Sequence, residues 1–111
     1  MNHARWKLAR EKKASGDYAE SPEAAAERSE VRLAMAFAKA VYDRRKALGL
    51  SQAQLAERAG LTQAKISRIE GADAVPTLPL LRRLATALDA ALNIALDADH
   101  EEVRFVARSA A

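Results

Sequence analysis

The stretch SQAQLAERAGLTQAKISRIEG, residues 51–71, joins two short amphipathic segments through a single glycine. Ser51 and Gln54 have the spacing of a capping box, in which each side chain bonds the other residue's backbone at a helix start. Gly60 can take the left-handed conformation that ends a helix. Thr62 then caps a second helix almost at once. Two helices with so short a joint must cross at a large angle, so the stretch predicts a helix-turn-helix unit.

Two more helices are predicted around this unit. Ser21, followed by proline and glutamate, is typical of a helix start, and the alanine-rich run after it has few breakers before Gly49. A last helix begins at Thr77. The apolar stripes that we expect to face the core are Leu33, Phe37, Ala40, Val41 and Leu48 in the first of these helices, Leu55, Ala56, Ala59, Leu61, Ile66 and Ile69 in the helix-turn-helix unit, and Leu78, Leu81, Leu84, Ala85 and Leu88 in the last.

The two ends of the chain predict different secondary structure. Residues 1–15 form a possible further helix with Trp6 as its large apolar anchor, and residues 15–23 after it are rich in turn formers. Near the C-terminus, residues 90–96 and 103–108 alternate between apolar and other side chains, which predicts two short strands. Since an isolated pair of strands is marginal in water, we expect them to pair with a second copy, with another protein or with the helical body. The alternative is that residues 90–97 prolong the last helix.

Charge and composition narrow the possible functions. The net charge of +3 is uneven, because residues 31–88 carry ten basic and four acidic side chains, which favours a polyanionic partner for that segment. The chain of 111 residues suffices for one domain with tails. It has no cysteine, the N-terminus MNHARWKLAREKK is unlike a signal peptide, and no apolar run approaches the roughly 18 residues of a membrane span. We therefore expect a cytoplasmic protein without a membrane partner.

Neither catalysis nor metal binding is expected. The only histidines are His3 and His100, and no glycine-rich phosphate loop accompanies them. The acidic cluster from Asp97 to Glu102 fails as a calcium loop, because glycine is missing at Glu102 and glutamate is missing at Arg108. We interpret the cluster as a solvated hairpin turn and predict no enzyme, no cofactor and no metal.

A longer pattern of residues resembles the XRE family of Cro/repressor-like DNA-binding domains over about residues 33–88. The resemblance implies a mainly all-α fold of four or five helices, with an N-terminal helical extension over residues 1–30, a helix-turn-helix domain over 31–88 and a strand-like tail over 89–111. The loop at Ala72 departs from the family, where glycine and basic residues are common. The pattern is carried by Gln52, Leu55, Ala56, Gly60, Leu61, Thr62, Ile66, Ser67, Ile69, Glu70, Pro76, Thr77, Leu78, Leu84, Ala85, Ala87 and Leu88.

The same resemblance assigns roles at a DNA surface. Gln52 is implied as a contact to phosphate or backbone, and Lys65 supplies charge for phosphate. The groove-facing side of the helix after Gly60 carries Thr62, Gln63, Ala64, Ser67 and Arg68. Glutamine can bond adenine and arginine can bond guanine with two hydrogen bonds each, so Gln63 and Arg68 are the expected base readers. Glu70 is expected to serve the scaffold, while Arg44, Arg45, Arg82 and Arg83 are left open between solvated face and phosphate contact.

Two functions fit this resemblance. HigA-type antitoxins of type II toxin–antitoxin pairs are similar in having one such domain with short extensions, and they neutralise a RelE/HigB-like ribonuclease toxin and repress their own operon. The alternative is a stand-alone repressor without a toxin partner. Both imply a homodimer on a palindromic double-stranded operator, because each recognition helix covers only a few base pairs. In the antitoxin case, Trp6 and Tyr18 are candidate anchors for the toxin.

Overall fold

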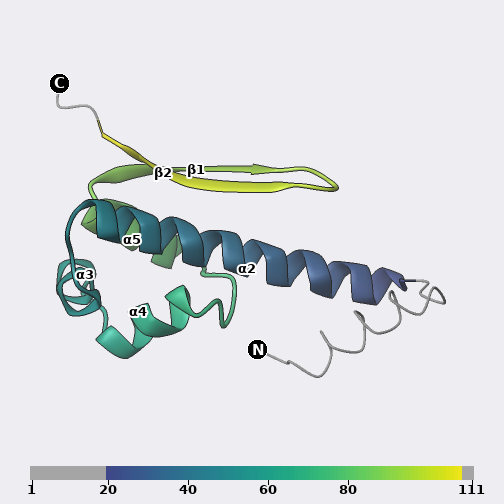
Figure 1. The fold of residues 1–111 in the computed structure, drawn as a ribbon, viewed down its shortest axis with the longest axis horizontal. Helices are drawn as coiled ribbons and strands as arrows, with labels where there is room; N and C mark the ends of the chain where they lie inside the picture. The colour runs from purple at the N-terminus through teal and green to yellow at the C-terminus, as the bar shows by residue number, and fades with distance from the viewer. Residues whose placement is uncertain (1–19, 109–111) are drawn as a thin grey trace.

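The computed structural model describes residues 20–108 and contains, within that range, four helices and one two-stranded antiparallel sheet (Figure 1). The helices and strands follow the order α2 (Pro22–Ala47), α3 (Gln52–Ala59), α4 (Gln63–Glu70), α5 (Leu78–Ala87), β1 (Ala90–Leu96) and β2 (Glu101–Ala107). The mainly helical fold is therefore confirmed. The helix predicted in residues 1–15, with Trp6, and the candidate anchor Tyr18 lie outside the described residues.

The four helices of residues 20–108 begin at the capping residues that the sequence predicts. The Ser21 hydroxyl accepts a hydrogen bond from the Ala24 backbone N–H at 3.1 Å and begins α2. The capping box of Ser51 and Gln54 is complete, with donor–acceptor distances of 3.0 and 2.8 Å. Thr62 caps α4 and Thr77 caps α5 in the same way. Each cap satisfies an amide that the first helical turn leaves without a partner, which fixes where the helix begins.

The core lies where α2, α3, α4 and α5 meet. Its fully buried side chains include Val41, Leu55, Ile66, Leu84 and Leu88, so the inward faces predicted for the helix-turn-helix unit are confirmed. Two members of the predicted stripes are wrong. Leu78 is 75% exposed because it is the first residue of α5, and the buried side chains of that helix begin only at Leu81. Leu48 lies beyond the last turn of α2 and is exposed, and Leu50 is buried in its place.

The C-terminal residues form a hairpin. Leu92 lies opposite Phe105 and Ile94 opposite Val103, so the strands predicted from the alternating pattern are confirmed, and the alternative of a prolonged helix is wrong. Within residues 20–108 the two strands pair only with each other. Phe105, Val103 and Leu92 pack against the core, which supplies the apolar cover that an isolated ribbon lacks.

The long helix α2 separates two layers. Figure 1 shows the hairpin along one side of α2, and α3 and α4 on the other side. Contacts between α2 and β2, and between α2 and α4, join the layers. No helix among residues 20–108 is long and apolar enough to cross a membrane.

Candidate nucleic-acid interface

Helix α4 has one buried and one exposed face. Ile66 and Ile69 are buried at 0 and 5% exposure and anchor the helix on the core. Ala64, Ser67 and Arg68 are exposed and stand at i, i+3 and i+4, so they share the face opposite the isoleucines. Three of the five residues predicted to face a DNA groove are thus brought together on the outer face of a helix whose inner face is fixed.

The remaining predicted residues flank this face. Thr62 is exposed, but its Oγ1 atom accepts the Lys65 backbone N–H at 3.1 Å, so the hydroxyl already serves as a cap. Lys65 is exposed on one flank of α4 and Gln63 on the other. Gln52 is half-buried, and its Nε2 atom donates to Glu70 Oε1 at 3.2 Å. A contact from Gln52 to DNA would therefore come from a side chain that the protein has already oriented.

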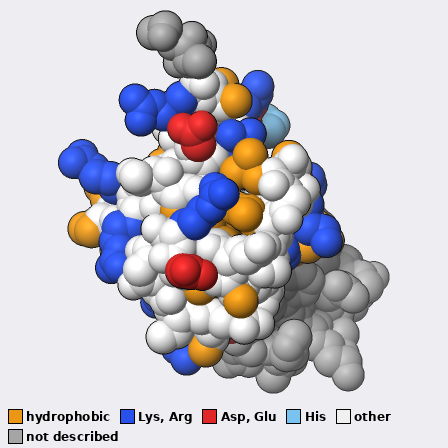
Figure 2. All heavy atoms as spheres, turned by 90° about the vertical axis from the view of Figure 1, so that its left-hand side faces the viewer, with side chains coloured by type: hydrophobic (Ala, Val, Ile, Leu, Met, Phe, Trp, Pro, Cys, Tyr) orange, Lys and Arg blue, Asp and Glu red, His pale blue; other side chains and the backbone are white. Residues whose placement is uncertain are grey.

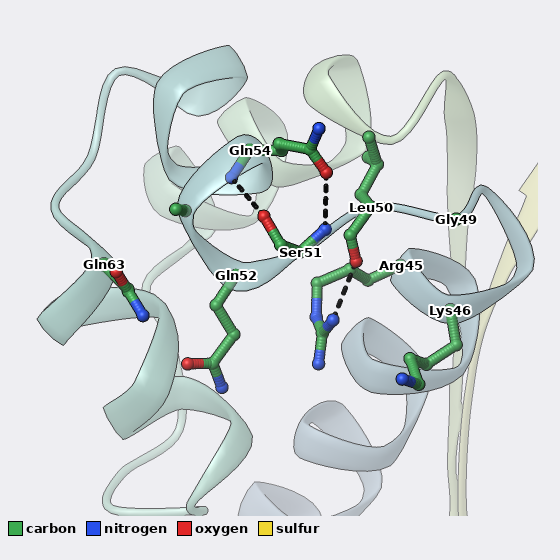
Figure 3. Close-up of a pocket in the computed structure, with 9 residues that line it drawn as sticks. Arg45, Lys46, Gly49, Leu50, Ser51, Gln52, Gln54 and Gln63 are labelled. Atoms are coloured by element: carbon green, nitrogen blue, oxygen red, sulfur yellow. Dashed lines mark hydrogen bonds between the residues drawn. The ribbon is translucent and has the colours of Figure 1, made fainter.

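A shallow, open pocket lies between the end of α2 and the start of α3. Figure 3 shows Gln52 extending into this space, with Gln63 of α4 on one side and Arg45 and Lys46 of α2 on the other. The N-terminus of α3 also borders the pocket and adds the partial positive charge of its free backbone amides. Sequence reasoning missed Lys46 as part of this group, because its neighbours come from helices that only the fold brings together.

The buried ion pair between Arg45 and Glu70 locks α4 onto α2. Arg45 Nε lies 2.7 Å from Glu70 Oε2 and Nη2 lies 2.9 Å from Oε1, with side-chain exposures of 8 and 7%. Arg45 Nη1 also donates to the Leu50 carbonyl at 2.8 Å. These hydrogen bonds to Glu70, opposed by burial, raise the pKa of the Arg45 guanidinium above its ordinary value, so the group stays charged.

This pair corrects one prediction and extends another. Arg45 is neither a solvated side chain nor a surface available to phosphate, because its guanidinium is buried against Glu70. Glu70 has the scaffold role that the sequence suggested: it binds Arg45 of α2 and Gln52 of α3 together. One carboxylate therefore sets the relative positions of three helices at the candidate interface.

A second arginine holds the turn between α3 and α4. Arg83 of α5 donates through Nε to the Ala59 carbonyl at 3.1 Å and through Nη2 to the Gly60 carbonyl at 2.6 Å. Gly60 has φ +67°, and a Cβ atom there would lie 2.8 Å from Arg83 Nη2. Glycine thus provides both the left-handed turn and the room for the arginine. In a similar way Arg44 donates to the carbonyls of Leu88 and Asp89, at 3.0 and 3.1 Å.

The loop after α4 contains a backbone feature that the sequence did not reveal. Ala72 has φ +58°, whereas the preceding Gly71 has φ −86°. A left-handed conformation costs a residue with a side chain roughly 1–2 kcal/mol. The departure from the family pattern therefore places alanine at a position where glycine would be free of strain.

The acidic cluster lies at the turn of the hairpin, far along the strands from the helix-turn-helix unit. The Asp97 carboxylate accepts the backbone N–H groups of Asp99 and His100 at 2.8 and 2.7 Å, which closes the turn. These two bonds lower the pKa of Asp97 below its ordinary value. Among the described residues, no group of three or more acidic, histidine or cysteine side chains is arranged to hold a metal ion.

Positive side chains surround the α3 end of the molecule. Figure 2 looks at this end and shows more Lys and Arg side chains than acidic ones on the visible face.

A comparison with protein-family models finds a match to the helix-turn-helix domain over residues 36–93, which is more than half of the chain. The chain belongs to the helix-turn-helix domain family. The helix-turn-helix assignment, of the XRE-like kind, is therefore confirmed, and it indicates sequence-specific DNA binding by a family that is typically not enzymatic. A search of curated proteins finds no match.

Proposed function

We propose that this helix-turn-helix protein represses transcription by placing α4 in the major groove of a palindromic operator as a homodimer. The observation that carries the proposal is the exposed face of Ala64, Ser67 and Arg68 on a helix whose opposite face is fixed by buried isoleucines and by the Arg45–Glu70 pair. A groove-reading helix needs this combination, because base edges are read by side chains held in a defined orientation.

The residues divide into base readers and backbone contacts. Gln63 and Arg68 can each make two hydrogen bonds to a base edge, to adenine and guanine respectively, and Ser67 and Ala64 leave room for close approach. Gln52, at the start of α3, contacts phosphate with support from Lys46 across the pocket. Lys65 contributes charge from the flank, and Thr62 contributes as the cap that sets the start of α4.

The finer proposal is an antitoxin that neutralises a RelE/HigB-like toxin and represses its own operon. Support comes from surface that the helix-turn-helix unit does not use: residues 94–108, beyond the family match, build most of a hairpin on the side of α2 away from α4. In this proposal residues 31–88 bind DNA, and residues 1–30 and 89–111 supply the dimer and toxin contacts. A stand-alone repressor is the alternative, and both share the operator-binding surface.

The DNA-binding surface is tested by the double variant Gln63→Ala with Arg68→Ala. Each lost bidentate contact costs about 1–3 kcal/mol of base discrimination, so we expect operator affinity to fall by two orders of magnitude or more. Both side chains are exposed, so the unfolding temperature should stay unchanged. Lys39→Ala with Asp43→Ala, an exposed ion pair on α2, is the matched control. An unchanged operator affinity in the folded double variant would contradict the assignment.

The antitoxin proposal is tested by co-expression with the small open reading frames beside the gene, followed by purification and mass measurement. We expect a stable complex with one partner whose growth arrest this chain relieves, and we expect the Gln63→Ala, Arg68→Ala variant to keep that complex. Recovery of a homodimer alone, still able to bind its promoter DNA, would favour the stand-alone repressor. Loss of both activities in the folded double variant would contradict the separation of the two surfaces.

A further inference from the structure

The two edges of the hairpin differ in how they are protected. In an antiparallel pair, alternate residues direct their backbone groups toward the partner strand. The Asp97 N–H donates to the His100 carbonyl at the turn end of the hairpin. Counting back in steps of two, the backbone groups of Ala95, Asn93 and Ala91 therefore bond β2. The residues between them direct their N–H and C=O groups to the outer edge of β1, where these groups are free. Within residues 20–108 no strand pairs with this edge.

Strand β1 lacks the features that keep an exposed edge single. Its seven residues, AALNIAL, contain no charge, no proline and no glycine, whereas β2 reads EEVRFVA and carries three charges. Natural proteins usually protect exposed edges with charges, proline or bulges, and an uncharged edge of this length is a template for another strand. The edge of β1, and not that of β2, is therefore the one suited to pairing.

The apolar face of β1 is incompletely covered by its own chain. Ala90 is 4% exposed where β1 leaves α5, but Ile94 is 39% and Leu96 is 61% exposed farther along the strand. Both side chains lie on the same face as Phe105 and Val103, which pack against the core. α5 has only ten residues and packs against β1, while the 26-residue α2 packs against β2. The far half of β1 thus exposes apolar side chains beside an open edge.

The charges of the hairpin favour a second copy of the same chain. Asp97 and Asp99 make the turn acidic, with Glu101 and Glu102 just beyond it. At the opposite end, where the hairpin leaves the helices, Arg44 and Arg58 bond the last carbonyls of α5 and its junction with β1. Charged residues at that end include Arg44, Arg58, Arg108 and Asp89. Antiparallel pairing of two hairpins lays the acidic turn of each beside the more basic end of the other.

We propose that β1 pairs antiparallel with β1 of a second copy to form a continuous four-stranded sheet. Pairing all seven residues places Asn93 opposite its own copy on the two-fold axis and Leu92 opposite the partner's Ile94. The axis of such a pair is normal to the sheet, so both copies of α2 lie on one face. Because α4 lies on the far side of α2 from the hairpin, both copies of α4 then face the same direction (Figure 1). This arrangement deepens the proposed function, since it presents two recognition helices to one side of a DNA duplex.

The absence of cysteine from the sequence allows a direct test of this register. Opposed residues that do not exchange hydrogen bonds have Cα atoms about 4.5 Å apart, which is within the range of a disulfide. We expect Asn93→Cys to form a covalent dimer on mild oxidation of the full chain, reversible by reductant. Arg104→Cys is the matched control, because Arg104 lies beside Asn93 within the hairpin and would occupy the axis if β2 paired instead. Cross-linking of Arg104→Cys alone, or of neither variant, would overturn the proposal.

A second variant pair tests the surface without a cross-link. We expect the parent chain to have twice the 12.0 kDa chain mass in solution, Ile94→Lys to have the single-chain mass, and Val106→Lys to remain dimeric. Ile94 and Val106 are similarly exposed, at 39 and 41%, so both substitutions should fold, which circular dichroism checks. A dimeric Ile94→Lys would overturn the proposal. A parent dimer that binds operator DNA without cross-linking through Asn93→Cys would leave the proposed function standing, whereas a cross-linked dimer without operator affinity would contradict that function alone.

Discussion

The helix-turn-helix unit and the hairpin both pack on α2 through apolar side chains, but they differ in the polar contacts that accompany this packing. In the unit, apolar packing is supplemented by buried, directional polar contacts: the Arg45–Glu70 pair joins α4 to α2, and the Arg83 bonds join the turn to α5. The hairpin is joined mainly by apolar contacts of Phe105 and Val103 and by an ion pair between Arg32 and Glu101 that is partly open to solvent. Orientation must be fixed where a helix reads bases, whereas a hairpin that offers an edge requires only a supporting surface.

The largest expected effect is on the free energy of unfolding, and it compares the removal of one ion-paired carboxylate from each region. Glu70→Ala leaves Arg45 charged and buried without its partner, which costs about 3–5 kcal/mol of the free energy of unfolding. Glu101→Ala is the matched change in the hairpin, where the partner Arg32 is 37% exposed and can regain water, so the cost should stay below about 1 kcal/mol. Denaturant unfolding of both variants measures the difference. Equal losses would show that the two regions are held by contacts of the same kind.

The next comparison lies within the helical region and uses two glycines with the same backbone conformation. Gly49 and Gly60 have φ +70° and +67°, so alanine at either costs roughly 1–2 kcal/mol of strain. The new Cβ meets nothing within 4 Å at Gly49, but at Gly60 it lies 2.8 Å from Arg83 Nη2. We expect Gly60→Ala to cost about 1 kcal/mol more than Gly49→Ala in the free energy of unfolding, because it also displaces charge-assisted hydrogen bonds.

The contribution of Arg83 can be isolated by repeating both glycine substitutions in a chain that carries Arg83→Ala. The difference between the two sites should then disappear, because the side chain that opposes the new methyl group is gone. Chemical unfolding of the four variants and their parents gives the coupling free energy directly. A difference that survives the removal of Arg83 would mean that the turn itself, and not the arginine, distinguishes Gly60 from Gly49.

The same division explains how much of the structure the sequence could predict. Ser51, Thr62 and Thr77 act through amides three residues away, so the helix starts were visible in the local sequence. Arg45 and Glu70 are 25 residues apart, and only the packing of α2 against α4 brings them together. The outer face of α4 followed from helical periodicity, but the pocket that joins Lys46 to Gln52 required the arrangement of two helices.

The smallest expected effect is a pH dependence of folding stability that comes from Asp97 in the hairpin turn. Bonds from the Asp99 and His100 backbone N–H groups lower the pKa of Asp97, so its ionised form favours the folded turn. This contribution is complete above the unfolded-state pKa of about 3.9 and is lost as the pH falls through the lower folded-state value. Asp97→Asn keeps a side-chain oxygen that can accept the same bonds but does not titrate, while Asp97→Ala removes the acceptor at every pH.

Thermal unfolding at pH 7, 5 and 3 distinguishes these cases. At pH 7 and pH 5 we expect Asp97→Ala to be the least stable of the three proteins, with the parent close to Asp97→Asn. Between pH 5 and pH 3 the parent should lose stability relative to Asp97→Asn, and the comparison cancels the titration of the other acids, which both proteins share. A difference between them that does not change with pH would mean that the two backbone bonds are made equally well by the protonated carboxyl group. The hairpin turn would then be held by hydrogen bonds whose strength does not depend on the charge of Asp97.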